Sequence, residues 1–232
     1  MTEKYSRVLI VGSGSGLSAS LARLFAREGF KVSLAARDAE KLAPLCASTG
    51  ATAFSCDASN PDQVGRLFQD VEAVNGAPDV VIYNASARAR GPFISLNAAE
   101  VETVIKVSAF GGFLVAQQAA KRMVAQGQGA ILFTGASASV KGYAQSAPFA
   151  MGKFALRGLA QSMARELAPM GVHVAHFIID GAIRNPGRSE ATNNPDSMLD
   201  PDAIAASYLH VLRQQRSAWT WEMELRPWVE KF

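Results

Sequence analysis

The hydrophobic residues of this chain fall into short continuous runs, and the segments between them have helical spacing. Runs such as Val-Leu-Ile-Val and Val-Val-Ile-Tyr are apolar throughout, as is typical of parallel strands buried on both faces. The predicted strands are Arg7–Val11, Lys31–Ala35, Thr52–Ser55, Val80–Tyr83, Ala130–Phe133, His173–Ile178 and one near Thr220–Leu225. Helices are expected to begin near Leu17, Ala39, Pro61, Ala99, Pro148 and Asp202.

Regular alternation of strands and helices predicts an α/β fold. We expect one doubly wound, Rossmann-type domain over residues 1–232, with a seven-stranded parallel sheet and helices on both faces. The length of 232 residues, 49% of them hydrophobic, suits a single large core. One stretch, at about 184–200, is rich in Asn, Pro, Gly and Ser, and it is predicted to be either a lid-like loop or a disordered surface loop.

Charge and composition argue against several classes of partner. The net charge is +3 with no block of Lys or Arg, so a nucleic-acid partner is not expected. No leader-like start and no apolar run of membrane-spanning length is seen, which predicts a soluble cytoplasmic protein. Cys46 and Cys56 are expected to be buried, inert thiols, and His173, His176 and His210 lack metal-binding spacing.

The turn after the first strand reads Val11-Gly12-Ser13-Gly14-Ser15-Gly16-Leu17 and leads directly into a helix. Glycines let a backbone approach a pyrophosphate, and the helix start offers free N–H groups and the positive end of its dipole. A plain strand-to-helix connection is the alternative. The second strand ends in Arg37, which can pair with a 2′-phosphate and so favours NADP(H), or can simply cap a helix in solvent.

Further loops follow the third and fourth strands, namely Asp57-Ala58 and Asn84-Ala85-Ser86. Together with the glycine turn and Lys153, these loops resemble those of the short-chain dehydrogenase/reductase family, from Val8 to about Leu225. The resemblance implies an NADP(H)-dependent oxidoreductase that interconverts a carbonyl compound and an alcohol by hydride transfer. It implies cofactor-binding roles for Gly12, Ser13, Ser15, Gly16, Leu17, Arg37, Asp57, Ala58, Asn84, Ala85, Ser86, Val107, Lys153, Asp180, Gly181 and Ile183.

The catalytic positions depart from the family pattern. Members carry a tyrosine four residues before the lysine, and here Phe149 stands at that place before Lys153. Family spacing puts Ala136 at the position of the serine that polarises the carbonyl, although Ser137 follows directly. We therefore expect Lys153, Ser137 and Tyr143 to be the catalytic residues, with Tyr143 or Lys153 supplying the proton, unless Tyr143 only packs on the lid.

The substrate is expected to be a small and mainly apolar carbonyl compound, because apolar residues surround the catalytic stretch (Phe93, Pro148, Phe149, Met151). Arg88 and Arg90 either recognise an anionic group or form a solvated loop face. The family's helix asparagine is replaced by Ser108. The missing tyrosine leaves open an NADP(H)-binding protein with impaired catalysis, acting as a sensor or hetero-oligomer subunit, or a reductase of C=N or C=C bonds.

Assembly is predicted from the two long helices around Ala99–Gln126 and Pro148–Pro169. Their small residues permit close packing, and in proteins that this chain resembles these helices form a dimer interface. A homodimer or homotetramer is expected. Three tryptophans near the C-terminus either cap the core or seal a subunit interface.

Overall fold

The computed structural model describes residues 5–190, 193 and 195–230. Its strands are β1 (Arg7–Val11), β2 (Lys31–Ala36), β3 (Thr52–Ser55), β4 (Val80–Tyr83), β5 (Gly129–Thr134), β6 (Val172–Ile179), β7 (Ala182–Ile183), β8 (Met198–Leu199) and β9 (Glu222–Leu225). Its α-helices are α1 (Leu17–Arg27), α2 (Ala43–Thr49), α3 (Pro61–Asn75), α4 (Ala98–Ile105), α5 (Gly111–Gln126), α6 (Ala147–Leu167) and α7 (Pro201–Leu212). Short helical turns are η1 (Glu40–Leu42), η2 (Phe93–Ser95), η3 (Lys106–Phe110), η4 (Ser137–Ser139), η5 (Ala168–Met170) and η6 (Arg216–Ala218).

The main sheet has seven strands in the order β3-β2-β1-β4-β5-β6-β9, and every neighbouring pair is parallel. Chain order reverses at β1, where Val8 faces Val32 of β2 on one side and Val80 of β4 on the other. The loops after β1 and β4 consequently separate at the carboxyl edge of the sheet, where ligands of such folds bind. The predicted doubly wound α/β fold is confirmed.

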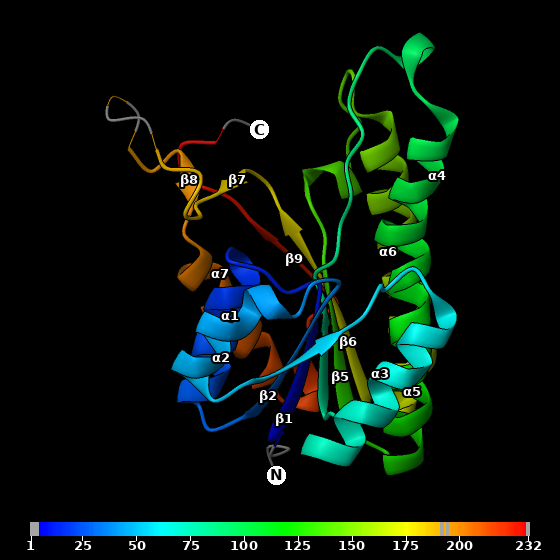
Figure 1. Ribbon diagram of the computed structural model, residues 1–232, viewed down its shortest axis with the longest axis vertical. Helices are drawn as coiled ribbons and strands as arrows, with labels where there is room; N and C mark the ends of the chain where they lie inside the picture. Colours follow the sequence, from blue (N-terminus) through cyan, green and yellow to red (C-terminus); the bar gives the residue numbers. More distant parts are fainter. Residues whose placement is uncertain (1–4, 191–192, 194, 231–232) are drawn as a thin grey trace.

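Helices cover both faces of this sheet (Figure 1). On one face α1 and α7 pack over a buried cluster that includes Phe25, Leu34 and Tyr208. On the other face α3, α5 and α6 pack over a second cluster that includes Phe68 and Leu156. Two such layers explain why the strands are apolar at every position rather than at every second one.

Two of the predicted helices are not regular α-helices over their whole predicted length. The helix expected from Ala39 begins as the 3₁₀ turn η1, and the α-helix starts only at Ala43. The long helix around Ala99–Gln126 is interrupted by η3, a π-helical turn that holds the fully buried Ser108. A Cβ atom at Gly152 of α6 would lie 2.8 Å from the Ser108 Cβ, so α6 passes very close to this turn.

The stretch at about 184–200 is anchored rather than structureless. β7 and β8 pair at its two ends, and Asn185 forms an antiparallel bridge with Arg188. Residues 191, 192 and 194 of the predicted lid lie outside the described residues. Its action as a lid stays a prediction.

The three tryptophans have different environments. Trp219 stacks on His173 with ring centroids 4.5 Å apart, and Trp221 lies under the guanidinium of Arg157. Trp228 is 82% exposed. The first two therefore cover the edge of the core, and the third does not.

Candidate active site

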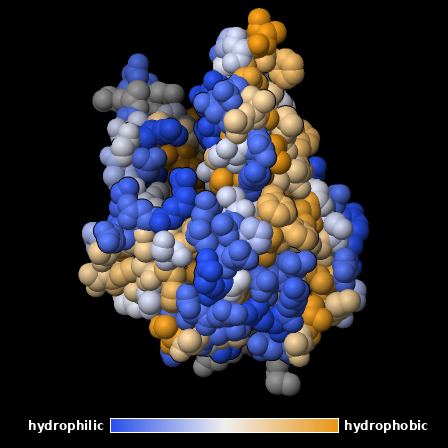
Figure 2. All heavy atoms as spheres, turned by 45° about the vertical axis from the view of Figure 1, so that its right-hand side comes forward, coloured by the Kyte–Doolittle hydropathy of each residue, from blue (hydrophilic) through white to orange (hydrophobic). Residues whose placement is uncertain are grey.

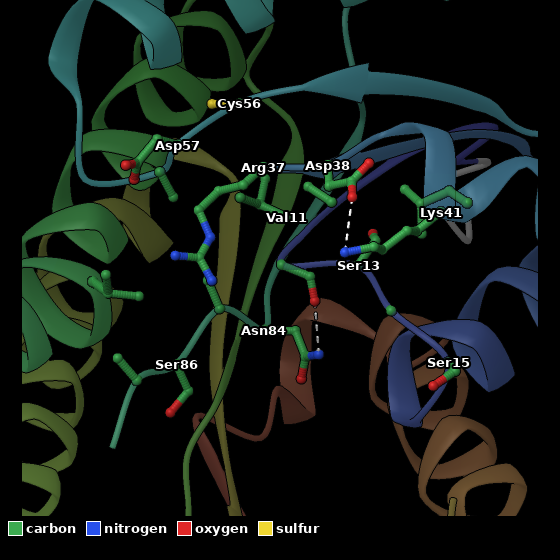
Figure 3. Close-up of a pocket in the computed structure, with 18 of the residues that line it drawn as sticks. Val11, Ser13, Ser15, Arg37, Asp38, Lys41, Cys56, Asp57, Asn84 and Ser86 are labelled. Atoms are coloured by element: carbon green, nitrogen blue, oxygen red, sulfur yellow. Dashed lines mark hydrogen bonds and ion pairs between the residues drawn. The ribbon is translucent and has the colours of Figure 1, made fainter. Parts of the chain in front are cut away.

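The turn between β1 and α1 is held tightly against the neighbouring strand ends. The backbone N–H groups of Gly12 and Ser13 both donate to the carbonyl oxygen of Ala35, at 2.9 and 3.0 Å. Asn84 donates from Nδ2 to the Gly12 carbonyl oxygen at 3.2 Å (Figure 3). Gly12 has φ +87°, and a Cβ atom there would lie only 2.3 Å from the Ala85 nitrogen, so glycine is required.

Helix α1 begins at this turn without a side-chain cap. Gly16 is its N-cap residue, and the first turn carries no acidic residue. The orphan N–H groups and positive dipole end are therefore available to a bound anion. This arrangement suits a pyrophosphate.

A cavity of about 600 Å³ opens beside the turn, at the ends of β1 to β4. Arg37 reaches into it from the end of β2, between Asp57 and Ser86 (Figure 3). Two hydrogen bonds from Ser59 lower the pKa of the Asp57 carboxyl, and the charge of Arg37 lowers it further. Of the residues predicted to bind a cofactor, this cavity is lined by Gly12, Ser13, Ser15, Arg37, Asp57, Ala58, Asn84, Ala85, Ser86 and Val107.

A second cavity, of about 760 Å³, adjoins the first, because Asn84 and Ser86 line both. The predicted residues Gly16, Leu17, Lys153, Gly181 and Ile183 also line it. The two cavities together thus contain every predicted cofactor residue except Asp180. Their shared wall lies at the switch point of the sheet.

Lys153 projects from α6 into the second cavity. Its side chain is 3% exposed, and Nζ donates to the Thr134 carbonyl oxygen at 2.7 Å. Burial, with a smaller contribution from the positive charge of Arg88, lowers the pKa of Lys153 to about 7. An amine with this pKa exchanges protons readily at neutral pH.

Phe149 lies one helical turn before Lys153 on the same wall. It is 7% exposed, and its ring is covered by the guanidinium of Arg88 at 4.3 Å from the ring centroid. The ammonium of Lys153 lies 5.8 Å from the same centroid. Two cations therefore face one aromatic ring.

The other two candidate catalytic residues lie elsewhere. Ser137 begins η4 and Tyr143, which is 46% exposed, lies on the loop before α6. Within the described part of the chain, neither lines the second cavity, whereas Ala136 does. The geometry gives no support to a direct role for Ser137 or Tyr143.

The apolar surroundings expected from the sequence are also different. Phe149 lines the second cavity, whereas Phe93, Pro148 and Met151 do not. Phe93 is 79% exposed and Met151 is 54% exposed. Ile179 and Ile183 contribute apolar side chains instead. Phe93 lies on η2 and Met151 on an exposed part of α6, so of the residues expected to surround the catalytic stretch only Phe149 lines this cavity; the apolar character of the substrate stays a prediction.

Asp180 is buried beside the cavity. Its carboxylate accepts from Lys141 at 3.3 Å and lies 3.4 Å from Arg226, while its N–H donates to the Leu225 carbonyl oxygen at 2.8 Å. Asp180 thereby joins the loop before α6 to the C-terminal segment and positions Gly181. The sequence offered no signal for these partners, which lie 39 and 46 positions away.

A buried polar network beneath the cavity was also missed. His176 makes contacts through Nε2 with Ser139 Oγ at 3.3 Å and through Nδ1 with Glu222 at 3.1 Å. Arg157 donates two hydrogen bonds to Glu222, at 2.6 and 2.7 Å, and Ser139 Oγ accepts from the Ala136 N–H at 3.1 Å. Burial lowers the pKa of His176 to about 4, so the ring is neutral and supports the turn that carries Ala136.

Two features are absent from the described residues, namely a membrane-spanning helix and a cluster of metal ligands. No helix in residues 5–190, 193 and 195–230 has both the length and the hydropathy needed to cross a bilayer. Over the same residues, no group of three or more His, Cys, Asp or Glu side chains could hold a metal ion.

Comparison with known proteins identifies relatives of this arrangement. The family model described as short chain dehydrogenase matches residues 6–194. The 3-oxoacyl-[acyl-carrier-protein] reductase MabA of Mycobacterium avium is 30% identical over 197 residues, which is 85% of this chain and 73% of MabA.

Solved structures agree over almost the whole chain. A short-chain dehydrogenase from Rhodopseudomonas palustris has a TM-score of 0.83 and 38% identity, covering 97% of this chain and 100% of its own. A metagenomic short-chain oxidoreductase in complex with NADP has a TM-score of 0.84 and 27% identity, covering 96% and 97%. The chain therefore belongs to the short-chain dehydrogenase family of oxidoreductases.

Proposed function

We propose that this protein is an NADP(H)-dependent oxidoreductase that interconverts a carbonyl compound and an alcohol. The observation that supports it most is the pair of adjoining cavities: the glycine turn and Arg37 line the first, and the uncapped start of α1 and the buried Lys153 line the second. Gly12 lets the turn after β1 pack directly against the backbone of Ala85, and this packing places the turn at the edge of the first cavity, where a pyrophosphate would bind. Arg37 supplies a cation for a 2′-phosphate, and a relative that was crystallised with NADP supports this choice of cofactor.

NADPH, when bound, supplies the hydride for the carbonyl carbon. The carbonyl oxygen must then receive a proton, and Phe149 has none to give. The ammonium of Lys153 is the group that fits: it faces the cavity, it is held by the Thr134 carbonyl oxygen, and its pKa lies near neutrality. In the reverse reaction, the neutral amine of Lys153 accepts the alcohol proton.

This assignment is tested with three single variants. Calorimetry first measures NADPH affinity for each variant, and the rate of NADPH oxidation is then compared across a panel of carbonyl compounds. Lys153→Met is expected to lose about 10²–10⁴ in kcat, the usual contribution of a general acid. Ser137→Ala and Tyr143→Phe are expected to retain activity within about threefold. If kcat falls as much in Tyr143→Phe as is expected for Lys153→Met, the proton comes from Tyr143 instead.

Phe149 also favours a second function. Phe149 replaces the family's tyrosine, and the guanidinium of Arg88 covers its ring. These features are compatible with a protein that binds NADP(H) without turnover and acts as a sensor or hetero-oligomer subunit. This function would be favoured if the protein binds NADPH but does not oxidise it in the presence of any carbonyl compound, imine or activated alkene. Turnover of imines or alkenes alone would indicate a reductase of C=N or C=C bonds. Phe149→Tyr is expected to raise carbonyl reduction if residue 149 faces the reacting atoms.

A homodimer or homotetramer is part of the proposal. Large apolar side chains are exposed along η3, α5 and α6, among them Phe110, Phe113 and Phe154 at 40–45% exposure. Apolar spheres gather on this face of the molecule (Figure 2). Patches of this kind commonly mark subunit interfaces. Light scattering should give the mass of two or four chains. Phe113→Asp should reduce the measured mass.

The cytoplasm is the proposed location. Both cysteines are free thiols, and burial raises the pKa of Cys56 to about 11, so it stays protonated and unreactive. A reducing compartment suits such a protein.

A further inference from the structure

The second cavity is lined by an unusual excess of positive charge. Its described lining residues include four arginines and a lysine, and none of them is an Asp or Glu. The cations are Arg88, Arg90, Arg184, Arg188 and Lys153. This excess of positive charge would not strengthen the binding of an uncharged apolar ketone.

Most of these arginines lack a compensating carboxylate. Arg184 pairs with Asp200 on α7. Within the residues that the structure describes, Arg88, Arg90 and Arg188 form no ion pair. Their mutual repulsion, together with burial as the larger cause, lowers the pKa of Arg88. A bound anion would relieve that repulsion.

Arg88 occupies a defined position rather than a solvated one. Its guanidinium lies over the Phe149 ring, with the central carbon 4.3 Å from the ring centroid. Its loop is tied on one side by the Ala87 N–H to the Ser108 hydroxyl at 3.3 Å, and on the other by the Gly91 N–H to the Gln145 carbonyl oxygen at 3.1 Å. A guanidinium has five N–H donors, and a contact with an aromatic ring leaves donors to bind an anion.

The cofactor accounts for only part of the positive charge. Asn185 lies next to the start of α1, with its Cβ 3.9 Å from the Cβ position of Gly16, so Arg184 and Arg188 flank the pyrophosphate side. Arg88 instead shares the Phe149 ring with Lys153, on the side of the candidate proton donor. Arg88 is therefore the arginine placed beside the candidate proton donor, while Arg188 lies near the start of α1 and still acts on Arg88 through its charge.

We propose that Arg88, assisted by Arg90, binds a carboxylate of the substrate, which is an oxo acid whose carboxylate lies only a few bonds from the carbonyl group. This inference rests on the proposed oxidoreductase function. The limit on the spacing follows because the two cations lie 4.3 and 5.8 Å from the same ring centroid, which restricts how far apart a carboxylate and a carbonyl oxygen that contact them can be. Ile179 and Ile183 remain to contact a short apolar chain of the same molecule.

The test compares acids with their neutral esters. The probes are 2-oxopentanoate and 4-oxopentanoate, their methyl esters, and pentan-2-one, each with NADPH. Wild-type protein is expected to favour at least one acid over its ester by about 10- to 100-fold in kcat/KM, the usual worth of a hydrogen-bonded charge pair. Arg88→Gln should remove this preference, because kcat/KM for the acid should fall about 10- to 100-fold more than kcat/KM for its ester at the same pH.

Controls separate this inference from the proposed function. Arg165→Gln, an exposed arginine on the same helix as Phe149, should behave as wild type. NADPH affinity should be unchanged in Arg88→Gln. If no probe is reduced, calorimetry of the NADP⁺ complex with 2-oxopentanoate and 4-oxopentanoate still tests binding, and the loss of such binding in Arg88→Gln would support the site even though the reaction had failed.

Two results would overturn the inference. One is reduction of esters and pentan-2-one at least as fast as of the acids, with the same preference in Arg88→Gln. The other is a rise in NADPH Kd in Arg88→Gln with no change in acid-to-ester preference, which would assign Arg88 to the cofactor.

Discussion

Lys153→Met is expected to lower kcat by about 10²–10⁴ and at the same time to stabilise the protein near neutral pH. Folding moves the pKa of Lys153 from its ordinary value of 10.5 to about 7, because the side chain is buried. At about 1.4 kcal/mol per pKa unit, the cost of holding this charge is about 5 kcal/mol at pH 7 or below. Methionine removes that cost.

The sign of the pH dependence follows from proton binding. Between pH 7 and 10.5 the unfolded chain binds a proton at Lys153 that the folded chain releases, so this lysine makes stability rise with pH over that window. The variant lacks this contribution. It also loses the hydrogen bond to the Thr134 carbonyl oxygen, at a cost of about 1–3 kcal/mol. The net gain should be about 2–4 kcal/mol at pH 7 and should become a small loss near pH 10.

Urea unfolding at pH 7, 8, 9 and 10 measures this difference. The matched control is Lys121→Met, which removes an exposed lysine from α5 and should follow the wild-type curve. If the stabilities of wild type and Lys153→Met change in parallel across this range, Lys153 does not have a lowered pKa. The assignment of Lys153 as the proton donor would then lose its physical basis.

Four further predictions follow from individual contacts. Gly12→Ala should strongly weaken NADPH binding in calorimetry, because its Cβ would lie 2.3 Å from the Ala85 nitrogen and would push the turn after β1 away from the loop after β4; retained affinity would show that this packing is not needed for binding. Arg37→Ser should weaken NADPH about 10-fold and leave NADH unchanged, and equal effects on both would refute the 2′-phosphate contact. His176→Leu should flatten the acid side of the stability curve: the wild-type ring, with a pKa of about 4, loses about 3 kcal/mol of stability as pH falls from 6.5 to 4, and a parallel curve would contradict this. Arg88→Gln should shift the pH profile of kcat to higher pH, because the charge of Arg88 lowers the pKa of Lys153. An unchanged profile would show that the two charges do not interact.

Much of the cofactor site was predictable because it depends on strand order alone. Each predicted residue from Gly12 to Ser86 follows a strand that the apolar pattern locates within one or two positions. Parallel strands bring their carboxyl ends to one edge, so the loops must meet there. The glycine turn, Arg37 and Asn84 consequently lie together without any knowledge of side-chain packing.

The immediate surroundings of Lys153 were not predictable in this way. Tyr143 is only ten positions from Lys153 in the sequence, yet the loop before α6 leaves it 46% exposed. Arg88 is 61 positions from Phe149, yet its guanidinium covers that ring. Loop conformations and close crossings, such as that of α6 with η3, set these distances, and a linear pattern contains no information about them.

The sequence by itself therefore determined the sheet, the edge at which a nucleotide would bind and the absence of a phenol at position 149, because periodicity and residue identity are local properties. Only the tertiary structure decided that Lys153 is buried enough for its pKa to fall to about 7 and that His176 contacts Glu222. It also decided that the segment after β7 and the loop after β4 both place arginines in one cavity. Burial and like-charge proximity arise from segments far apart in the chain, and they exist only once those segments are packed together.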